Sequence, residues 1–413
     1  MDDRRTLLVR VSGRDQPGIT AALLDVLAAG GVDVYDMEQV TTRDRLSLDL
    51  LVGLPVDGDR ISDRVVKDIL FLGWERGLDV DFEPVEAHAA TAPPQRYAVT
   101  VIGAPLTAAA LAAVAHRIAG AGANIDRIVR LSRYPVVSYE LVVSGGHADT
   151  LRAGLLHAAA EHAIDVAVQR EGLERRAKRL VVMDVDSTLI QDEVIDLLAE
   201  EAGTYDRVRD VTERAMAGEL DFGEALRARV ALLAGLDRDA LERVRARVRL
   251  TPGARTFVRT LKRLGFQVAI VSGGFSLFTD PLAAELGITH CFANELQIVD
   301  GRVTGRLVGR ILDRAAKADV LEEVARREDI PLEQTVAIGD GANDLDMLAR
   351  AGLGVAFNAK PAVRQAADTS VSVPYLDAVL FVLGIRRDEV DAADERDLHD
   401  RGDPVPVQGV PPL

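Results

Sequence analysis

The chain has 413 residues, enough for about two to four domains, and its 48% hydrophobic and 28% charged residues are typical of a globular protein. Its 49 basic and 65 acidic residues give a net charge of −16, which argues against a general affinity for nucleic acid or anionic lipid. The single cysteine, Cys291, excludes an intrachain disulfide, and with seven scattered histidines we expect no zinc site. We see no signal-like segment and no membrane span, and we expect a cytoplasmic protein.

The first part of the chain carries one pattern twice. Residues 5–83 contain an alternating strand, a helix, two strands, a second helix and a last strand, the βαββαβ order of a ferredoxin-like unit. The same order recurs over 97–169, and Gly13 has its counterpart 90 residues later in Gly103. We therefore predict a duplicated domain, with bounds 1–85 and 96–172 and a proline-containing linker between them.

The sequence pattern changes at Leu180. Unbroken apolar runs predict strands that are buried on both faces, namely 180–183, 268–271, 336–338 and 354–357. Helical patterns separate them, which indicates an α/β domain with a mostly parallel, Rossmann-like sheet over 178–385. Residues 193–250 show only helical patterns and predict an inserted helical cap, whereas Asp300-Gly301 predicts a tight hairpin.

The C-terminal segment, 386–413, has few apolar residues. It holds eight acidic residues and four arginines over 386–403, and four prolines in the last eleven positions. Such a segment has little apolar surface to offset the entropy lost on ordering. We therefore expect a disordered tail.

Two carboxylates follow the first buried strand directly. Asp184 and Asp186 come after 180–183, and in open parallel sheets ligands bind at the carboxyl ends of the strands. Two unit charges about 4 Å apart repel by about 4 kcal/mol at an effective dielectric of about 20, so a bound cation would stabilise the pair. A helix-capping run of aspartates without chemistry is the alternative.

A second acidic cluster follows the strand at 336–338. It contains Asp340, Asn343 and Asp344, so two carboxylate clusters are expected at one edge of the sheet. Ligands that are all oxygen suit Mg²⁺. Taken alone, this motif could be an ordinary turn of Asp, Asn and Gly.

Two further features complete a set of four. Ser272 and Gly273 follow the strand at 268–271, where a hydroxyl and glycine N–H groups can cradle an anion. Lys317 lies on an amphipathic helix and would by itself be a solvated lysine.

Together these motifs, in this order, resemble the haloacid dehalogenase superfamily of phosphohydrolases, and within it the phosphoserine phosphatases. The resemblance covers about 180–383 and includes Phe292-Ala293-Asn294. It implies hydrolysis of O-phospho-L-serine with Mg²⁺ as cofactor, as the last step of serine biosynthesis. It also implies that Asp184 is the nucleophile that forms an aspartyl-phosphate and that Asp186 is the general acid and base.

The resemblance assigns the remaining chemistry as well. Asp184, the Asp186 backbone carbonyl and Asp340 would hold the metal, with Asp344 in support. Ser272, Gly273 and Lys317 would hold the phosphoryl oxygens, and Asn343 would contact the phosphoryl group or its neighbours.

Substrate choice is expected in the cap. Arg229 would bind the carboxylate of phosphoserine and Glu193 its ammonium, while Met216 and Phe222 would form an apolar wall that excludes water. Arg229 could instead belong to a solvated arginine face, and Met216 and Phe222 could simply be cap core.

The two N-terminal units resemble ACT domains, which usually bind amino acids. Asp15 and Gly18 lie in the loop between the first strand and helix, where such domains bind ligands, and backbone N–H groups there suit a carboxylate. The second unit, with Gly103-Ala104-Pro105, lacks the acid and the second glycine. We expect serine as the effector, and a homodimer because ACT domains commonly pair between chains.

Two rival functions stay open. One is a phosphatase or phosphotransferase for another phosphomonoester, and the other is an amino-acid sensor whose phosphatase fold is only a scaffold. The basic stretch at 175–179 could suggest nucleic-acid binding, but the acidic net charge and its position favour a solvated linker.

Overall fold

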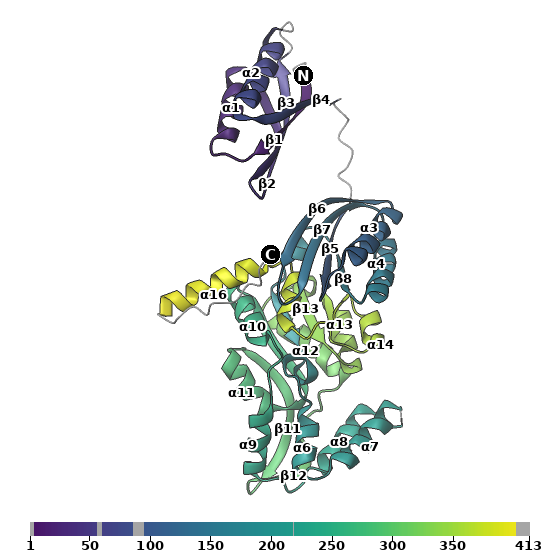
Figure 1. The fold of residues 1–413 in the computed structure, drawn as a ribbon. Coiled ribbons are helices and arrows are strands. Elements are labelled where there is room, and N and C mark those ends of the chain that lie inside the picture. The colour runs from purple at the N-terminus through teal and green to yellow at the C-terminus, as the bar shows by residue number, and fades with distance from the viewer. Residues whose placement is uncertain (1–3, 56–59, 86–94, 218, 402–413) are drawn as a thin grey trace. The chain divides into compact units, whose positions relative to one another are not determined.

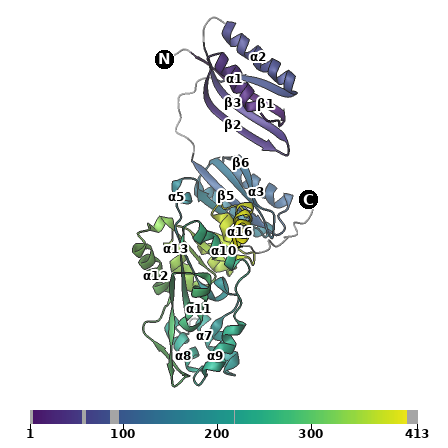
Figure 2. The same cartoon turned by 90° about the vertical axis from the view of Figure 1, so that its left-hand side faces the viewer.

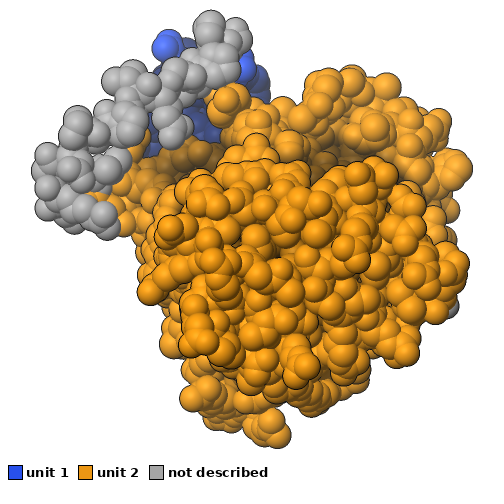
Figure 3. Space-filling model, turned by 90° about the horizontal axis from the view of Figure 1, so that it is seen from below, with its two compact units in different colours: residues 1–93 blue, residues 94–413 orange. Residues whose placement is uncertain are grey.

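The computed structural model describes residues 4–55, 60–85, 95–217 and 219–401. It divides into two compact units, residues 1–93 and residues 94–413, which Figure 3 colours separately. Within the described residues, no helix is both long and apolar enough to cross a membrane.

The first unit is the predicted βαββαβ fold. Its strands form one antiparallel sheet in the order β2-β3-β1-β4, and helices α1 and α2 cover one face of it (Figure 2). Every second residue of β1 and β3 turns toward these helices, so Val9, Leu48 and Leu50 are buried. The elements are β1 (Arg4–Arg14), α1 (Ile19–Ala29), β2 (Asp33–Thr42), β3 (Arg45–Pro55), α2 (Arg60–Arg76) and β4 (Leu78–Pro84).

The second repeat has the same topology, which confirms the duplication. Its sheet order, β6-β7-β5-β8, corresponds strand for strand to that of the first repeat. The elements are β5 (Arg96–Gly103), α3 (Ala108–Gly120), β6 (Ala123–Ser132), β7 (Val137–Gly145), α4 (Ala148–His162) and β8 (Asp165–Arg170).

The two repeats differ in the sheet face that points away from their helices. In the first repeat this face carries charges, such as Arg10, which pairs with Asp81 and Glu83. In the second repeat the equivalent positions include Ile102 and Ala167, which are buried in the same hydrophobic cluster as the third domain's sheet. The second repeat therefore packs directly onto the third domain.

Polar contacts reinforce this packing. The Asp165 carboxylate accepts hydrogen bonds from the Ser372 N–H at 2.6 Å and the Ser370 hydroxyl at 3.4 Å. Arg175 is buried and pairs with Glu140 and Glu171. The expectation of a solvated linker at 175–179 is therefore wrong for Arg175 and Lys178, whose side chains are buried, whereas Arg176 and Arg179 are exposed.

The third domain contains a seven-stranded sheet in the order β12-β11-β10-β9-β13-β14-β15. Its neighbours are parallel except for the β11–β12 hairpin, which turns at Asp300 and Gly301, both with positive φ, as predicted. The strands are β9 (Leu180–Met183), β10 (Gln267–Phe275), β11 (His290–Val299), β12 (Arg302–Val308), β13 (Thr335–Gly339), β14 (Gly354–Phe357) and β15 (Thr369–Val371).

Helices cover both faces of this sheet, which explains its unbroken apolar strands. Val181 and Met183 of β9 belong to one hydrophobic cluster, and Leu180 and Val182 belong to another. The surrounding helices are α5 (Leu173–Arg176), α10 (Ala254–Arg263), α11 (Ser276–Leu286), α12 (Arg314–Arg327), α13 (Leu345–Arg350), α14 (Pro361–Ala366) and α15 (Val379–Val382).

The predicted helical cap lies between β9 and β10 in the chain. It consists of α6 (Val194–Glu201), α7 (Tyr205–Met216), α8 (Phe222–Ala231) and α9 (Arg238–Arg247), gathered beside the β11–β12 hairpin (Figure 1). Its two connections to the sheet run side by side, joined by an Ile190–Leu250 bridge and an Asp192–Arg249 ion pair.

The tail prediction is wrong for part of its length. Residues Arg387–Arg401 form helix α16, in which Val390 is buried. Two arginines of α10, Arg259 and Arg263, pair with Asp394. Contacts with the folded domain thus offset the entropy that this segment loses on ordering. The remaining predicted tail, 402–413, lies outside the described residues.

Candidate active site

Three carboxylates meet at the edge of the sheet where β9 and β13 end. Asp184 follows β9, Asp340 follows β13, and Asp344 lies one turn further on. One oxygen of each lies within 4.8 Å of the other two. The two acidic clusters that are far apart in the sequence are therefore one site.

Lys317 lies inside this cluster. Its side chain is fully buried, with Nζ 2.8 Å from Oδ1 of Asp184 and 2.7 Å from Oδ1 of Asp344. The position follows from α12, whose first turn is capped by the Asp313 carboxylate accepting from the Ala316 N–H. The alternative of a solvated helix lysine is therefore wrong.

The charges of this group suit an added cation. Three carboxylates and one ammonium leave a negative excess in a site where Asp184, Asp344 and Lys317 are buried and Asp340 is partly buried. Burial and the neighbouring Asp344 raise the pKa of Asp340 to about 6, and the same two causes raise the pKa of Asp184. Oxygen-only donors with uncompensated charge are the surroundings in which Mg²⁺ binds.

Asp186 is turned into the same space by a sharp turn over Val185–Leu189. Ser187 in this turn has φ 57, a left-handed conformation that costs a non-glycine residue about 1–2 kcal/mol. The Asp186 carboxylate accepts from the Val194 N–H at 2.9 Å and from the Ser272 hydroxyl at 2.8 Å. Burial raises its pKa, which favours a carboxyl group that can carry a proton.

The segment Ser272–Gly274 lies against Asp186. The Ser272 hydroxyl is fully buried and accepts from the Gly274 N–H at 2.7 Å. A Cβ on Gly274 would lie 2.8 Å from Oδ2 of Asp186, so only glycine fits at that position. A Cβ on Gly273 would lie 3.3 Å from the ring of Phe222, so the cap reaches this segment.

Glu193, which precedes α6, and Arg229, on α8, are close enough to interact electrostatically. Glu193 accepts from the Ser187 hydroxyl at 2.7 Å, and burial, with the charge of Asp186 next, raises its pKa to about 7. Arg229 is half-buried, and burial lowers its pKa although the charges of Glu193 and Asp196 act against this. The alternative of a solvated arginine face is therefore wrong for Arg229.

Asp196 is a member of this group that sequence reasoning missed. It stands three residues after Glu193 on α6, so helical spacing could have found it. Burial raises its pKa, and Arg229 is the charge that most opposes that shift.

Two predicted residues are less closely engaged. Asn343 is half-buried, and its Oδ1 would lie 2.1 Å from a Cβ on Gly341. Met216 is the last residue of α7, and its side chain lies outside the described part of the structure.

The predicted loop of the first unit is exposed. Asp15 accepts from the Thr41 hydroxyl at 3.4 Å, and Gly18 precedes α1 with φ 90, a conformation that favours glycine. The structure thus brings Asp15 near β2, and Asp15 and Gly18 are both exposed to solvent.

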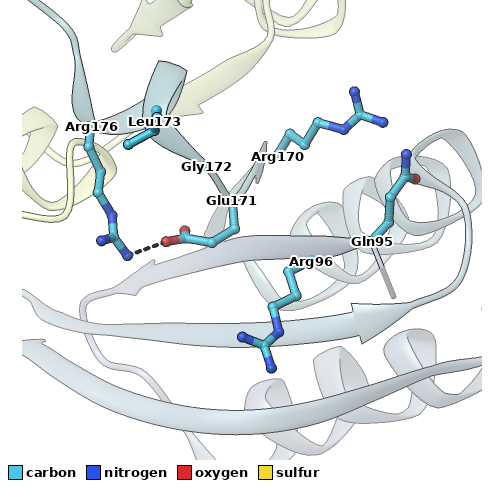
Figure 4. Close-up of a pocket in the computed structure, with 7 residues that line it drawn as sticks. All are labelled: Gln95, Arg96, Arg170, Glu171, Gly172, Leu173 and Arg176. Carbon is cyan, nitrogen blue, oxygen red and sulfur yellow. Dashed lines mark hydrogen bonds and ion pairs between the residues drawn. The ribbon is translucent and has the colours of Figure 1, made fainter. Parts of the chain in front are cut away.

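A pocket of about 470 Å³ lies elsewhere, at the ends of β5 and β8 (Figure 4). It contains Arg96, Arg170 and Arg176. Because Tyr97 is opposite Arg170 in the strand register, Arg96 and Arg170 point to opposite faces of the sheet. Arg176 is held by Glu171 at 2.5 Å, so these cations do not converge on one ligand.

Comparisons with known proteins agree with this geometry. Residues 181–349 match the haloacid dehalogenase-like hydrolase family, and residues 5–83 and 96–169 match ACT domains. A phosphoserine phosphatase of Streptomyces coelicolor is 57% identical over 394 residues, 95% of each chain. Another, of Mycobacterium tuberculosis, is 49% identical over 412 residues, 98% of this chain and 100% of that one.

Solved structures extend the comparison. An unliganded probable phosphoserine phosphatase from Vibrio cholerae has a TM-score of 0.57 and 35% identity, over 72% of this chain and 88% of its own. A haloacid dehalogenase family hydrolase from Salmonella enterica has a TM-score of 0.61 and 27% identity, over 70% and 98%. From this similarity, which spans nearly the whole chain, we conclude that the protein belongs to the phosphoserine phosphatase family of haloacid dehalogenase-like hydrolases.

Proposed function

We propose that this protein hydrolyses O-phospho-L-serine to L-serine and phosphate, the last step of serine biosynthesis. The observation that carries the proposal is the buried group of Asp184, Lys317 and Asp344 beside Asp186. Similarity to phosphoserine phosphatases over nearly the full chain supports it.

In this proposal the reaction begins with Asp184 as the nucleophile. Its Oδ1 accepts from Lys317 and from the Val185 N–H, which leaves Oδ2 to attack phosphorus. As the bond from Asp184 to phosphorus forms, the bond from phosphorus to the serine oxygen breaks. Protonated Asp186 gives its proton to that oxygen, so serine leaves as a neutral alcohol.

The second half of the reaction restores the enzyme. Asp186, now ionised, takes a proton from water as the water oxygen attacks phosphorus. The bond between phosphorus and Asp184 breaks, and phosphate is released. The raised pKa of Asp186, caused by burial, suits a group that must both give and take a proton.

The residues present also fit Mg²⁺. In our proposal Asp184, Asp340 and the Asp186 backbone carbonyl hold it. Asp344 supports them, because its oxygens already accept from Lys317 and the Gly341 N–H. When bound, Mg²⁺ would lower the repulsion between the carboxylates and the negatively charged phosphoryl group.

Four of this chain's groups would hold the phosphoryl oxygens: Ser272, Gly273, Lys317 and Asn343. The Lys317 ammonium supplies a full positive charge at a point from which water is excluded, where it stabilises developing negative charge most strongly. The Ser272 hydroxyl, now donating to Asp186, can rotate to donate to the substrate instead.

Substrate choice would rest on two opposite charges. Arg229 donates only its Nε–H in the contacts that the structure records, to the Ala225 carbonyl at 3.4 Å, so its NH₂ groups can bind the substrate carboxylate as a pair. The Glu193 carboxylate would balance the ammonium. Phe222, next to Gly273, would close the apolar side of the site together with Met216.

ACT domains usually bind amino acids, and both repeats match this family. We propose serine as the effector, with its ammonium at Asp15 and its carboxylate at the backbone near Gly18. Homodimer formation and a cytoplasmic location stay predictions. If serine neither binds the whole chain nor changes its activity, the regulatory part is contradicted.

The test of the function is phosphate release from three substrates, with Mg²⁺ and with EDTA. Phosphoserine is compared with phosphoethanolamine, which lacks the carboxylate, and with 3-phosphoglycerate, which has a hydroxyl in place of the ammonium. We expect phosphoserine to lead, EDTA to abolish release, and Arg229→Ala to remove the preference over phosphoethanolamine. A different preferred ester would contradict the roles of Glu193 and Arg229, and release from no ester would favour the sensor scaffold.

A further inference from the structure

A break in the sheet ladder lies directly beside the phosphoryl-binding segment. Strands β10 and β11 pair in register up to Val271 and Phe292, and then resume with Phe275 opposite Asn294. Three residues of β10 therefore face one residue of β11. A bulge of this kind leaves backbone groups without ladder partners and turns side chains toward a site.

The side chain of Asn294 supplies one of the missing hydrogen bonds. Its Nδ2 donates to the Gly273 carbonyl at 2.8 Å, and its Oδ1 accepts from the Leu312 N–H, also at 2.8 Å. Asn294 is only 2% exposed. A buried amide that uses its donor and its acceptor in this way has one orientation and one position.

The second partner leads to the other half of the phosphoryl site. Leu312 immediately precedes Asp313, the N-cap of α12, and this helix carries Lys317 about one turn later. One amide thus joins the segment with Ser272 and Gly273 to the start of the Lys317 helix. Both ends of that link are main-chain atoms, so the link fixes backbones and not only side chains.

We propose that Asn294 is a positioning residue that sets the distance between the Ser272-Gly273 segment and Lys317. This inference rests on the proposed function, because it concerns the two groups that would hold the phosphoryl oxygens. A displacement of about 1 Å between such groups can lower the rate of a reaction about 100-fold. Asn294 itself touches no reacting atom.

The chemistry of the amide explains why asparagine is needed. An ionised aspartate at this position would place a carboxylate oxygen against the Gly273 carbonyl, so attraction would become repulsion. Leucine has nearly the same shape but neither donates nor accepts. Each substitution separates the two segments without removing any group that contacts substrate.

The test compares Asn294→Asp with the wild-type chain and with Asn124→Leu, a change at an exposed asparagine. We expect N294D to lower kcat by about 10–100-fold, to weaken inhibition by orthovanadate similarly, and to change KM less than about 3-fold. We expect this small change in KM because Glu193 and Arg229, which would bind the amino and carboxylate groups of the substrate, are unchanged. N124L should match the wild type.

A merely structural role would lower Tm and leave the kcat of the folded protein unchanged. A folded N294D with kcat within about 2-fold of the wild type overturns the inference. If N294D does not fold, Asn294→Gln, which keeps both amide groups on a longer arm, is judged by the same criteria. If the wild type prefers another ester, the proposed function fails separately, and the same kcat ratio is measured with that ester.

Discussion

Loss of Lys317 is the perturbation with the largest expected effect on the folded state. At an effective dielectric of about 20, unit charges separated as Nζ is from Asp184 and from Asp344 attract by about 6 kcal/mol for each pair. Lys317→Met keeps the volume but removes the charge, and leaves carboxylates within 4.8 Å of one another. Because removal of one partner from a buried ion pair costs about 3–5 kcal/mol, we expect K317M to lower the free energy of opening of this domain by that amount at pH 7.

The assay must report on the third domain alone. Trp74, the only tryptophan, lies in the first unit, so tryptophan fluorescence would report on the wrong part of the chain. Amide hydrogen exchange of β9 and β13 gives the opening free energy directly. Lys360→Met, at an exposed position, is the control and should change it by less than about 0.5 kcal/mol. A change below about 1 kcal/mol in K317M would refute the argument from buried charge.

Three other predictions follow from named contacts. The Glu193 carboxyl, with a pKa of about 7, must be ionised to balance an ammonium, so KM for phosphoserine should rise as pH falls below 7. Glu193→Gln should have a higher KM, and that KM should lack the pH dependence that ionisation of Glu193 causes in the wild type. Gly274→Ala should lower kcat at least about 10-fold, since its Cβ would displace the Asp186 carboxylate; unchanged kinetics would contradict the assigned contact. Asp165→Ala should lower the free energy of opening at the Ser372 amide by about 1–3 kcal/mol, because it leaves the Ser372 N–H unpaired. Hydrogen exchange of that amide measures the change, and an equal exchange rate in the variant and the wild type would contradict the prediction.

Much of the fold follows from local patterns. The two βαββαβ repeats are visible because alternating strands and turns lie close together in the chain. The parallel sheet is visible because strands buried on both faces leave unbroken apolar runs. The pattern does not predict that the second repeat packs on the third domain, although the apolar sheet face with Ile102 carries that information.

The tail and the basic stretch show a limit of composition. Helix α16 is ordered by arginines that lie more than a hundred residues earlier, in α10. Arg175 resembles a solvated linker residue until Glu140 is folded beside it. In both cases one stabilising partner is distant in sequence, so a local window does not contain that contact, although Arg175 also pairs with Glu171 four residues before it.

For the candidate site, residue types were more predictable than their connections. The positions of Asp184, Asp340 and Lys317 were expected at strand ends and on one helix. Asn294 had no assigned role, because the bulge that calls for its amide exists only once β10 and β11 are paired. Asp196 was missed for a similar reason, since its significance depends on Arg229 coming from another helix.

The central claim is that Asp184 takes the phosphoryl group from phosphoserine. The most direct measurement is mass spectrometry of the protein after acid quenching during turnover of phosphoserine with Mg²⁺. We predict one phosphoryl group on the peptide that contains Asp184, and none in Asp184→Asn. Turnover with no phosphorylated peptide, or with the group on another residue, would contradict the account.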